Sequence, residues 1–308
     1  YNFLNKRMNI LVTGGAGFIG KHLVKFLIEN KNNVSILDNF SNSDKKWISK
    51  FKKYQIKIFE GDIRNDEDIL KATKDQDVVI HLAAKISVEE SIKNPSETFE
   101  INVKGTENVL EICKKNNVKK IIVASSAAVY GEGNEKYKIT EQTKLNAISP
   151  YGESKIEMEK EIIKFCSNNQ INYVILRFFN IYGLNQSMEY AGVITKFLEK
   201  IEKSENLIIF GDGTQTRDFV AIEDIINSIH NAMEYTENGI FNIASGEKIT
   251  IKELAELMIL LSNKTLDIEY VKAKKGDIKY SEADIQLAKN YLNYFSKIEL
   301  KDGIKKLM

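Results

Sequence analysis

The sequence predicts an α/β fold, in which a doubly wound parallel sheet carries helices on both faces and a smaller discontinuous domain follows. Two observations predict this fold. Short apolar, β-branched runs alternate with longer helical patterns as far as residue 180. Most positions in these runs are apolar, as in strands that are buried on both faces of a sheet. The length of 308 residues suits one large domain or two domains of ordinary size.

The alternation predicts the elements in order. The predicted strands are Asn9–Thr13, Asn33–Asp38, Ile56–Glu60, Asp77–Leu82, Lys120–Ser125 and Tyr173–Phe178, with helices near 17–30, 66–74, 96–116 and 151–168. After residue 180 the spacing changes, and we expect helices at 190–203, 221–235 and 250–262 and a short strand, Phe241–Ile243, that rejoins the sheet. The larger domain is expected over residues 8–180, completed by about 218–245, and the smaller one over 181–217 and 246–308.

Composition excludes several classes of protein. The formal net charge is +1, so the chain has no bulk field that would attract nucleic acid or an anionic membrane. No run of 18 apolar residues predicts a membrane span, and the apolar run from Ile10 breaks into glycines too early for a signal peptide. Cys113 and Cys166 lie far apart in helical patterns, so we expect buried free thiols and a cytoplasmic location. The three histidines lack metal-ligand spacing, and we expect no bound metal.

A glycine-rich turn, Gly14-Gly15-Ala16-Gly17-Phe18-Ile19-Gly20, joins the first predicted strand to the first helix. Gly14 allows a tight turn, Gly17 allows the backbone to approach a pyrophosphate, and Gly20 allows the helix to pack on the strand. The N-terminus of the helix offers free N–H groups and a positive dipole end to the phosphates. In this context the glycines predict a Rossmann-type dinucleotide-binding domain rather than a simple turn.

Asp38 ends the next predicted strand, where a carboxylate can accept hydrogen bonds from the adenosine ribose and repel a 2′-phosphate. It therefore favours NAD over NADP. Gly61-Asp62-Ile63 follow the third strand. Asp62 can bond the adenine amino group while Ile63 packs on the ring, although the same residues also suit a plain turn.

Tyr151 and Lys155 open a predicted helix just after Pro150, and their spacing of four places them on one helix face. A tyrosine hydroxyl is a poor base at its ordinary pKa of about 10. A nearby ammonium favours the phenolate and lowers that pKa. Ser126 ends a strand, at the edge of the sheet where ligands bind in doubly wound folds. These three residues predict a catalytic site beside the dinucleotide.

Taken together, these motifs resemble the extended short-chain dehydrogenase/reductase family. Further matches are His81-Leu82-Ala83-Ala84, Asn102, Asn180 and Arg217-Asp218, and the resemblance covers residues 8–292. Within the family the chain is most similar to nucleotide-sugar epimerases of the UDP-glucose 4-epimerase type. The resemblance implies Ser126, Tyr151 and Lys155 as the catalytic triad, and His81 as a residue that shapes the turn after its strand.

The resemblance also implies the binding residues. For NAD they are Gly14, Gly17, Phe18, Ile19, Gly20, Asp38, Asn39, Asp62, Ile63, Leu82, Ala83, Ala84, Asn102, Tyr151, Lys155 and Phe178. For the UDP-sugar they are Ser126, Asn180, Val193, Arg217, Lys274, Asp277 and Ser281. Asn102 matches an asparagine that stabilises the active-site helix, often through water, whereas Asn180 and Arg217 match residues on the substrate diphosphate. Lys274 stands where the family has an arginine, so it would meet phosphate as a point charge.

The implied reaction is inversion at C4 of the sugar. Tyr151 removes the C4 hydroxyl proton with help from Ser126, hydride passes to NAD, and a transient 4-keto sugar turns before hydride returns to its other face. Related 4,6-dehydratases and decarboxylases carry an acid just after the catalytic serine or threonine, where this chain has Ala127 and Ala128. A reductase would tend towards NADPH, which Asp38 disfavours, and a catalytically silent NAD-binding protein would typically have lost the tyrosine or the lysine.

Ser281 matches a family position where a bulky tyrosine excludes N-acetyl sugars and a small residue admits them. UDP-N-acetylglucosamine is therefore expected as a substrate beside UDP-glucose, unless Ser281 simply faces solvent. Helices 96–116 and 151–168 carry apolar stripes. In similar family members two such helices pair with those of a second copy, so we expect a homodimer, although such stripes also suit packing on the sheet.

Overall fold

Seven parallel strands form the central sheet of the computed structural model, which describes residues 7–43, 45, 47, 51, 54, 56–187, 192–274 and 276–308. Their order across the sheet is β10-β6-β5-β4-β1-β2-β3. The strands are β1 (Asn9–Thr13), β2 (Asn33–Asp38), β3 (Lys57–Glu60), β4 (Val78–His81), β5 (Lys120–Ser126), β6 (Asn172–Phe178) and β10 (Gly239–Ile243). The predicted doubly wound parallel sheet is confirmed, and the strand predicted at Phe241–Ile243 joins it beside β6.

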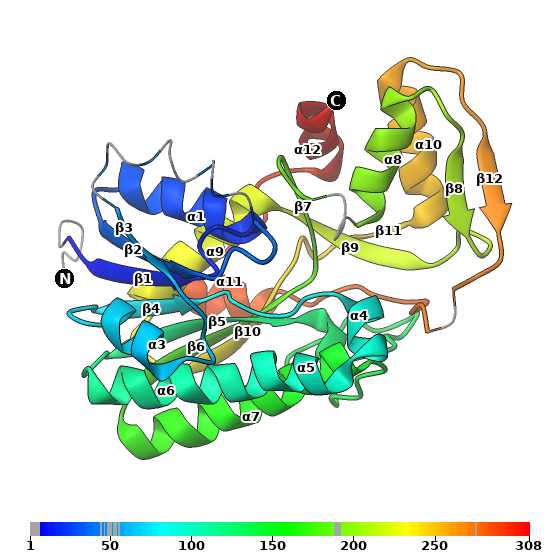
Figure 1. The fold of residues 1–308 in the computed structure, drawn as a ribbon. Coiled ribbons are helices and arrows are strands. Elements are labelled where there is room, and N and C mark those ends of the chain that lie inside the picture. Colours follow the sequence, from blue (N-terminus) through cyan, green and yellow to red (C-terminus); the bar gives the residue numbers. More distant parts are fainter. Residues whose placement is uncertain are drawn as a thin grey trace.

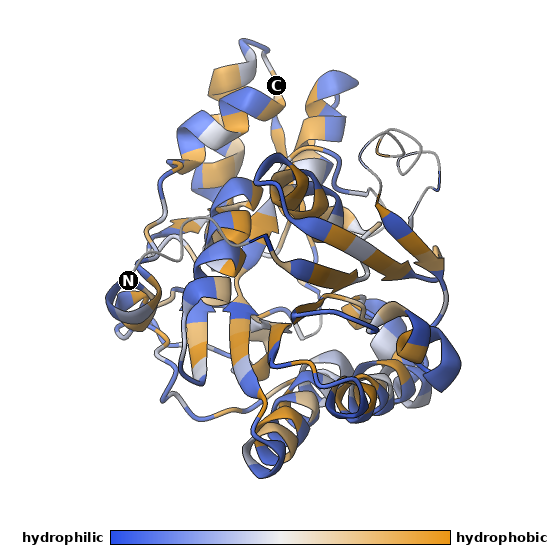
Figure 2. Ribbon diagram, turned by 90° about the vertical axis from the view of Figure 1, so that its left-hand side faces the viewer, coloured by the Kyte–Doolittle hydropathy of each residue, from blue (hydrophilic) through white to orange (hydrophobic). Residues whose placement is uncertain are grey.

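Helices cover both faces of this sheet (Figure 1). One face carries α1 (Phe18–Glu29), α9 (Ile222–Glu234) and α11 (Gln286–Leu292), and the other carries α3 (Asp66–Ala72), α6 (Gly105–Lys115) and α7 (Pro150–Asn169). Strand side chains alternate between the two cores: along β1, Ile10 and Val12 face the first while Leu11 faces the second. Burial on both faces explains why the central strands are mostly apolar, and the hydropathy colours of Figure 2 show apolar residues along the strands.

A smaller lobe stands beyond the carboxyl ends of the strands (Figure 1). It contains β8 (Leu207–Phe210) paired with β12 (Ile268–Val271), and the sheet of β7 (Asn180–Tyr182), β9 (Thr216–Ala221) and β11 (Lys248–Thr250). The helices α8 (Val193–Glu202), α10 (Ile251–Ser262) and α12 (Leu300–Leu307) complete it and share a third apolar core. The side chain of Thr250 caps α10 in a reciprocal capping box with Glu253.

The helix predicted at 96–116 is present from Pro95 to Lys115, but it is not a regular α-helix throughout. It consists of α5 (Pro95–Phe99), a π-helical turn η2 (Glu100–Lys104) and α6. The side chain of Asn102 lies in the π-turn and bonds to two other elements, and such turns occur mostly at functional sites. A further short helix, α4 (Val88–Lys93), and the 3₁₀ turn η3 (Ala127–Val129) were not predicted.

The predicted helices after residue 180 are confirmed with small shifts. The one predicted at 190–203 begins at Val193, and its first two predicted residues lie outside the described part of the chain. Among the described residues, no helix is both long and apolar enough to cross a membrane.

Candidate active site

A large cleft lies between the carboxyl ends of the central strands and the smaller lobe, and residues of both parts line it. The predicted NAD-binding residues line it, with the exception of Asn102. The same cleft is lined by all seven predicted substrate-binding residues: Ser126, Asn180, Val193, Arg217, Lys274, Asp277 and Ser281. The fold therefore brings residues from distant parts of the chain into one site, at the edge of the sheet where this topology places ligands.

The glycine-rich turn has the close contacts that only glycine allows. Gly14 has φ +66°, and a Cβ on it would lie 2.8 Å from the backbone nitrogen of Ala83. A Cβ on Gly20 would lie 2.4 Å from the Gly14 carbonyl oxygen, because α1 packs directly against the turn. Helix α1 begins at Phe18, so its N-terminus opens on the cleft beside Gly17. This is a cradle that suits a pyrophosphate.

Asp38 fixes this turn to the end of β2. Its Oδ2 accepts a hydrogen bond from Ala16 N at 2.9 Å, and its Oδ1 accepts one from Phe40 N at 2.8 Å. The side chain is buried but lines the cleft, as the predicted ribose contact requires. Asp38 thus has a structural role that sequence reasoning did not foresee, in addition to the predicted one.

Asp62 is held by two neighbours at the far end of the cleft. Arg64 donates to both of its carboxylate oxygens, at 2.9 and 2.8 Å, and Asn39 donates to it at 2.9 Å. The hydrogen bonds from Arg64 hold the pKa of Asp62 well below its usual range. Asp62 is therefore ionised at neutral pH and can accept from an amino group, so the predicted adenine contact stays a prediction with a suitable acceptor.

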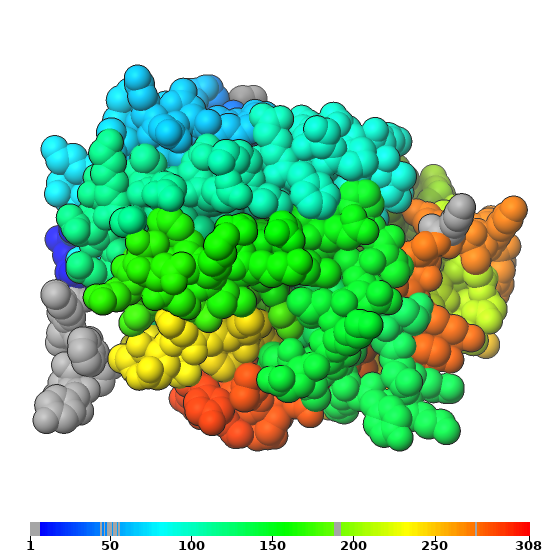
Figure 3. All heavy atoms as spheres, turned by 90° about the horizontal axis from the view of Figure 1, so that it is seen from below, coloured from blue at the N-terminus to red at the C-terminus, as the bar shows by residue number. Residues whose placement is uncertain are grey.

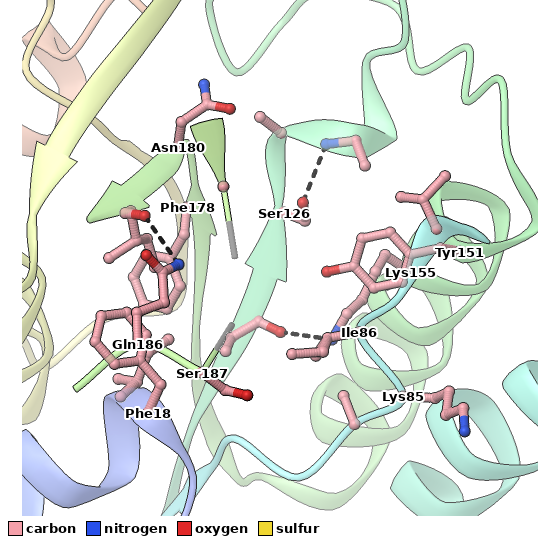
Figure 4. A pocket seen from close by; sticks show the side chains of 18 of the residues that line it. Phe18, Lys85, Ile86, Ser126, Tyr151, Lys155, Phe178, Asn180, Gln186 and Ser187 are labelled. Atoms are coloured by element: carbon pink, nitrogen blue, oxygen red, sulfur yellow. Dashed lines mark hydrogen bonds between the residues drawn. The ribbon is translucent and has the colours of Figure 1, made fainter. Parts of the chain in front are cut away.

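Ser126, Tyr151 and Lys155 face the same part of the cleft (Figure 4). Ser126 is the last residue of β5, while Tyr151 and Lys155 lie in the first two turns of α7. Helix α7 starts where the chain predicts it, with the Ser149 side chain as N-cap and Pro150 in the first turn. The Lys155 Nζ donates to the Ala124 carbonyl oxygen at 2.9 Å, which holds the ammonium beside the strand that ends in Ser126.

Burial alters the protonation of this group of residues. It raises the pKa of the Tyr151 hydroxyl, and the interaction with Ser126 opposes that rise. Burial lowers the pKa of Lys155 to about 8, and the Glu159 carboxylate opposes that change. The site therefore holds a neutral tyrosine beside a lysine whose pKa lies at about 8. A cation bound next to Tyr151 would favour its phenolate.

Asn102 lies behind the site rather than in it. Its side chain accepts from Lys85 N at 2.7 Å, donates to Lys85 O at 3.0 Å and donates to the Ser154 hydroxyl at 2.9 Å. Asn102 therefore ties the loop after β4 to the residue that precedes Lys155. The contact with the active-site helix, which the resemblance gives as often made through water, is direct here.

His81 is buried and makes two hydrogen-bond contacts, with Thr13 Oγ1 at 2.7 Å and with Thr106 Oγ1 at 3.0 Å. Burial, together with the nearby Lys155 charge, lowers the pKa of His81 to about 3. It stays neutral and links β1, β4 and α6, in agreement with the predicted shaping role.

Cationic residues of the smaller lobe line the cleft, among them Lys196, Arg217 and Lys274, and the last two are the predicted phosphate ligands. Arg217 is nearly buried and pairs with Asp277 at 2.5 Å, whereas Lys274 is more exposed and lies 3.6 Å from Glu89 across the cleft. Asn180 donates to the Asp218 carbonyl oxygen at 3.0 Å, which fixes its amide near Arg217. Both predicted phosphate ligands therefore carry carboxylate partners in this structure.

Sequence reasoning missed several lining residues, among them Lys85, Ile86, Phe179, Gln186 and Ser187 (Figure 4). Gln186 accepts from Thr195 at 2.8 Å, so it joins the connection after β7 to α8. Lys85 and Ile86 could have been noticed, because they lie in the loop that follows β4, a strand that ends at the cleft. Among the described residues, no group of three or more His, Cys, Asp or Glu side chains is placed to hold a metal ion.

The residues present fit a bound dinucleotide. The glycine cradle takes a pyrophosphate, Asp38 and Asp62 offer acceptors beyond it, and Lys155 and Tyr151 stand at the other end. Fold and site together define an α/β dinucleotide-binding enzyme of the extended short-chain dehydrogenase/reductase class. Residues 10–244 match the model of the NAD-dependent epimerase/dehydratase family, and the chain belongs to that family.

Named relatives agree with this assignment. The chain is 40% identical to a putative UDP-glucose 4-epimerase of Methanocaldococcus jannaschii over 302 residues, which cover 97% of each chain. It is similar in structure to UDP-glucose 4-epimerase from Thermotoga maritima, solved with UDP-glucose, with a TM-score of 0.92, 34% identity and coverage of 97% and 96% of the two chains. The same TM-score and identity relate it to UDP-N-acetylglucosamine 4-epimerase from Methanobrevibacter ruminantium M1 in complex with UDP-N-acetylmuramic acid, with 98% and 97% covered.

Proposed function

We propose that this protein is a UDP-sugar 4-epimerase that keeps NAD bound through its catalytic cycle. The observation that carries the proposal is the meeting of Ser126, Tyr151 and Lys155 at the end of β5, beside the glycine cradle. The residues after Ser126 are Ala127 and Ala128, so the acid that related dehydratases place there is replaced by methyl groups. UDP-glucose and UDP-galactose are the proposed pair of substrates, with UDP-N-acetylglucosamine in addition.

NAD, when bound, supplies the group that accepts and then returns hydride at C4 of the sugar. The chain's own residues handle the protons and the orientation. The Lys155 ammonium favours the phenolate of Tyr151, which takes the C4 hydroxyl proton and becomes a neutral phenol. Ser126 donates its hydrogen bond to the same oxygen, which becomes the carbonyl of the transient 4-keto sugar.

The diphosphate stays anchored while the keto sugar turns. We assign this anchoring to Asn180 and Arg217, with Lys274 as an additional cation. A guanidinium can bridge two phosphate oxygens, whereas an ammonium acts as a point charge. The proton that Tyr151 holds then returns to the C4 oxygen, so that the enzyme ends the cycle in its starting state.

The test is a conversion without added cofactor. The purified protein is incubated with UDP-glucose, UDP-galactose or UDP-N-acetylglucosamine, and the products are followed by NMR. Inversion at C4 supports the proposal. A 4-keto-6-deoxy product would identify a dehydratase, and no change with any sugar nucleotide would identify a silent NAD-binding protein.

We also propose a homodimer formed through α6 and α7. The two helices lie side by side and form a broad face of the molecule (Figure 3). Their apolar stripes pack on the sheet, through Val109 and Leu110 of α6 and Met158 and Ile162 of α7. The outward faces of α6 and α7 would therefore make the contact. Light scattering after size-exclusion chromatography tests this, and a monomer at micromolar concentration would contradict it.

The expected cytoplasmic location stays a prediction, consistent with the free, buried Cys113 and Cys166.

A further inference from the structure

The segment from Asp277 to Ser281 lines the substrate side of the cleft without forming a helix or a strand. Strand β9 holds one side of it. Thr216 N donates to the Lys279 carbonyl oxygen at 2.8 Å, and Thr216 Oγ1 accepts from Ser281 N at 3.3 Å. The position of Ser281 in the cleft therefore depends on backbone bonds to this segment.

Glu132 holds the other side of the same segment. Both of its carboxylate oxygens lie 2.9 Å from Lys279 N, and Oε1 also accepts from Tyr280 N at 2.8 Å. The next residue adds a backbone bond, since Gly133 N donates to the Tyr280 carbonyl oxygen at 3.0 Å. Gly131, with φ +69°, turns the chain just before Glu132 and lines the cleft. One carboxylate thus satisfies two consecutive amides of an irregular, substrate-facing segment.

The charge of Glu132 also acts on the guanidinium of Arg217, which lines the cleft. Burial lowers the pKa of the Arg217 guanidinium, and the carboxylates of Asp277 and Glu132 both oppose that change. Hydrogen bonds from N–H groups to an ionised carboxylate are about twice as strong as those between neutral groups. A carboxylate at position 132 therefore binds the two amides of the segment and stabilises the charge of Arg217 better than a neutral side chain would.

We infer that Glu132 is a positioning residue for the UDP-sugar, which fixes the Asp277–Ser281 segment from the side opposite β9 and thereby sets Arg217 and Ser281 for the ligand. The inference rests on the proposed function. It links the loop after the catalytic serine, six residues from Ser126, to the segment that faces the sugar nucleotide. Glu132 acts through the backbone of this segment, so it affects binding of the nucleotide sugar more than the chemical step.

The experiment compares Glu132→Ala, Glu132→Gln and the control Glu135→Ala. Glu135 is an exposed acid in the same loop, and its carbonyl oxygen rather than its side chain bonds to Lys248. For each protein we would measure KM and kcat for UDP-glucose, the Kd of UDP by calorimetry, the content of bound NAD and the thermal midpoint. Glu132→Gln keeps an oxygen that can accept one amide, so it tests the charge even if the alanine variant folds poorly.

We expect Glu132→Ala to raise KM and the Kd of UDP by about three- to thirtyfold, the range of one or two ordinary hydrogen bonds, because Glu132 acts on the ligand only through the segment. Glu132→Gln should show a smaller rise in KM and Kd. In both Glu132 variants kcat and NAD content should stay within about twofold of the parent protein. In Glu135→Ala all four quantities should stay within about twofold. Unchanged KM and Kd in both Glu132 variants would overturn the inference, as would an equal loss of kcat and NAD. A parent protein that binds UDP but leaves every UDP-sugar unchanged would overturn the proposed function instead, and one that does not bind UDP would overturn both.

Discussion

Glu159 and Arg177 form an ion pair in the interior of the protein, with Nη2 and Oε2 2.6 Å apart and both side chains at most 4% exposed. The same carboxylate accepts from the Ser125 hydroxyl at 2.5 Å, and Arg177 donates to the Tyr130 hydroxyl at 2.8 Å. The pair thus joins α7, which carries Lys155, to the two strands beside it. We predict that Arg177→Met lowers the free energy of unfolding by about 3–5 kcal/mol, because it leaves a buried carboxylate unpaired.

Urea denaturation would measure this loss. The matched control is Glu157→Gln, which breaks the exposed pair with Lys160 on the same helix and should cost less than about 1 kcal/mol. Equal effects of the two substitutions would show that burial does not set the strength of these pairs.

Tyr151→Phe tests the proton transfer. We expect turnover to fall by about 10²- to 10⁴-fold, since the hydroxyl that carries the proton is absent, while NAD content stays unchanged. Tyr137→Phe is the control, because that side chain is 74% exposed. A Tyr151→Phe variant with full activity would contradict the proposed mechanism. A variant that no longer contains bound NAD would assign Tyr151 to cofactor binding alone.

The pH dependence follows from Lys155. Burial lowers its pKa to about 8, so the ammonium is present below that pH and is lost as the pH rises through it. We expect kcat/KM to fall above about pH 8, because neutral Lys155 no longer favours the phenolate of Tyr151. His81, whose pKa is lowered to about 3, does not change charge in this range.

Lys120 offers a control for that assignment. Burial lowers its pKa to about 8 as well, but it lies at the other end of β5, where Nζ donates to the Met233 carbonyl oxygen at the end of α9. The alkaline fall should persist in Lys120→Met. A fall that disappears in this variant would report an opening of the structure rather than the titration of Lys155.

Arg217 and Lys274 should contribute unequally to binding. The Arg217 side chain is 11% exposed and that of Lys274 is 43% exposed. We expect Arg217→Ala to raise the Kd of UDP by about ten- to a hundredfold and Lys274→Ala by less than about fivefold, because a buried bidentate contact is stronger than a solvated point charge. Calorimetry on the two variants measures both Kd values. A larger effect of Lys274→Ala would indicate that the diphosphate binds closer to Lys274 than to Arg217.

Substitution of Ser281 tests whether this residue decides if the site accepts an N-acetyl sugar. It lines the cleft and is only 2% exposed, so a larger side chain has to enter the cleft or displace its neighbours. Ser281→Tyr should selectively impair UDP-N-acetylglucosamine, with UDP-glucose turnover changed by less than about threefold. Ser281→Ala is the control for loss of the hydroxyl alone. Equal impairment of both sugars would mean that Ser281 does not select the substituent.

The parts of the fold that follow local rules were predictable from the sequence. Asn9–Thr13 and Asn33–Asp38 were bounded correctly because strands buried on both faces are mostly apolar and end at turn residues. The strands of the small lobe were not, although its helices were, since Leu207 in β8 pairs with Ile268 in β12, far along the chain. Only the folded chain brings them together.

The same division holds for the site. Residues in continuous motifs, such as Gly14 and Tyr151, could be named in advance, because the spacing itself carries the chemistry. Gln186 and Glu132 could not, because their contacts with Thr195 and Lys279 depend on how loops fold over the sheet. Asn102 was predicted through the resemblance alone, and the π-turn that places it has no local signal.

That π-turn gives the helix from Pro95 to Lys115 one residue more than a regular helical path would need. Deleting a residue from it would restore the ordinary pitch and strengthen the helix. It would also rotate the side chains on one side of the deletion by about 100° and separate Asn102 from either Lys85 or Ser154. The regular helix would therefore gain stability at the cost of a link between the loop after β4 and the helix that carries Tyr151 and Lys155. The irregularity thus gives one side chain a hold on two separate parts of the site's framework.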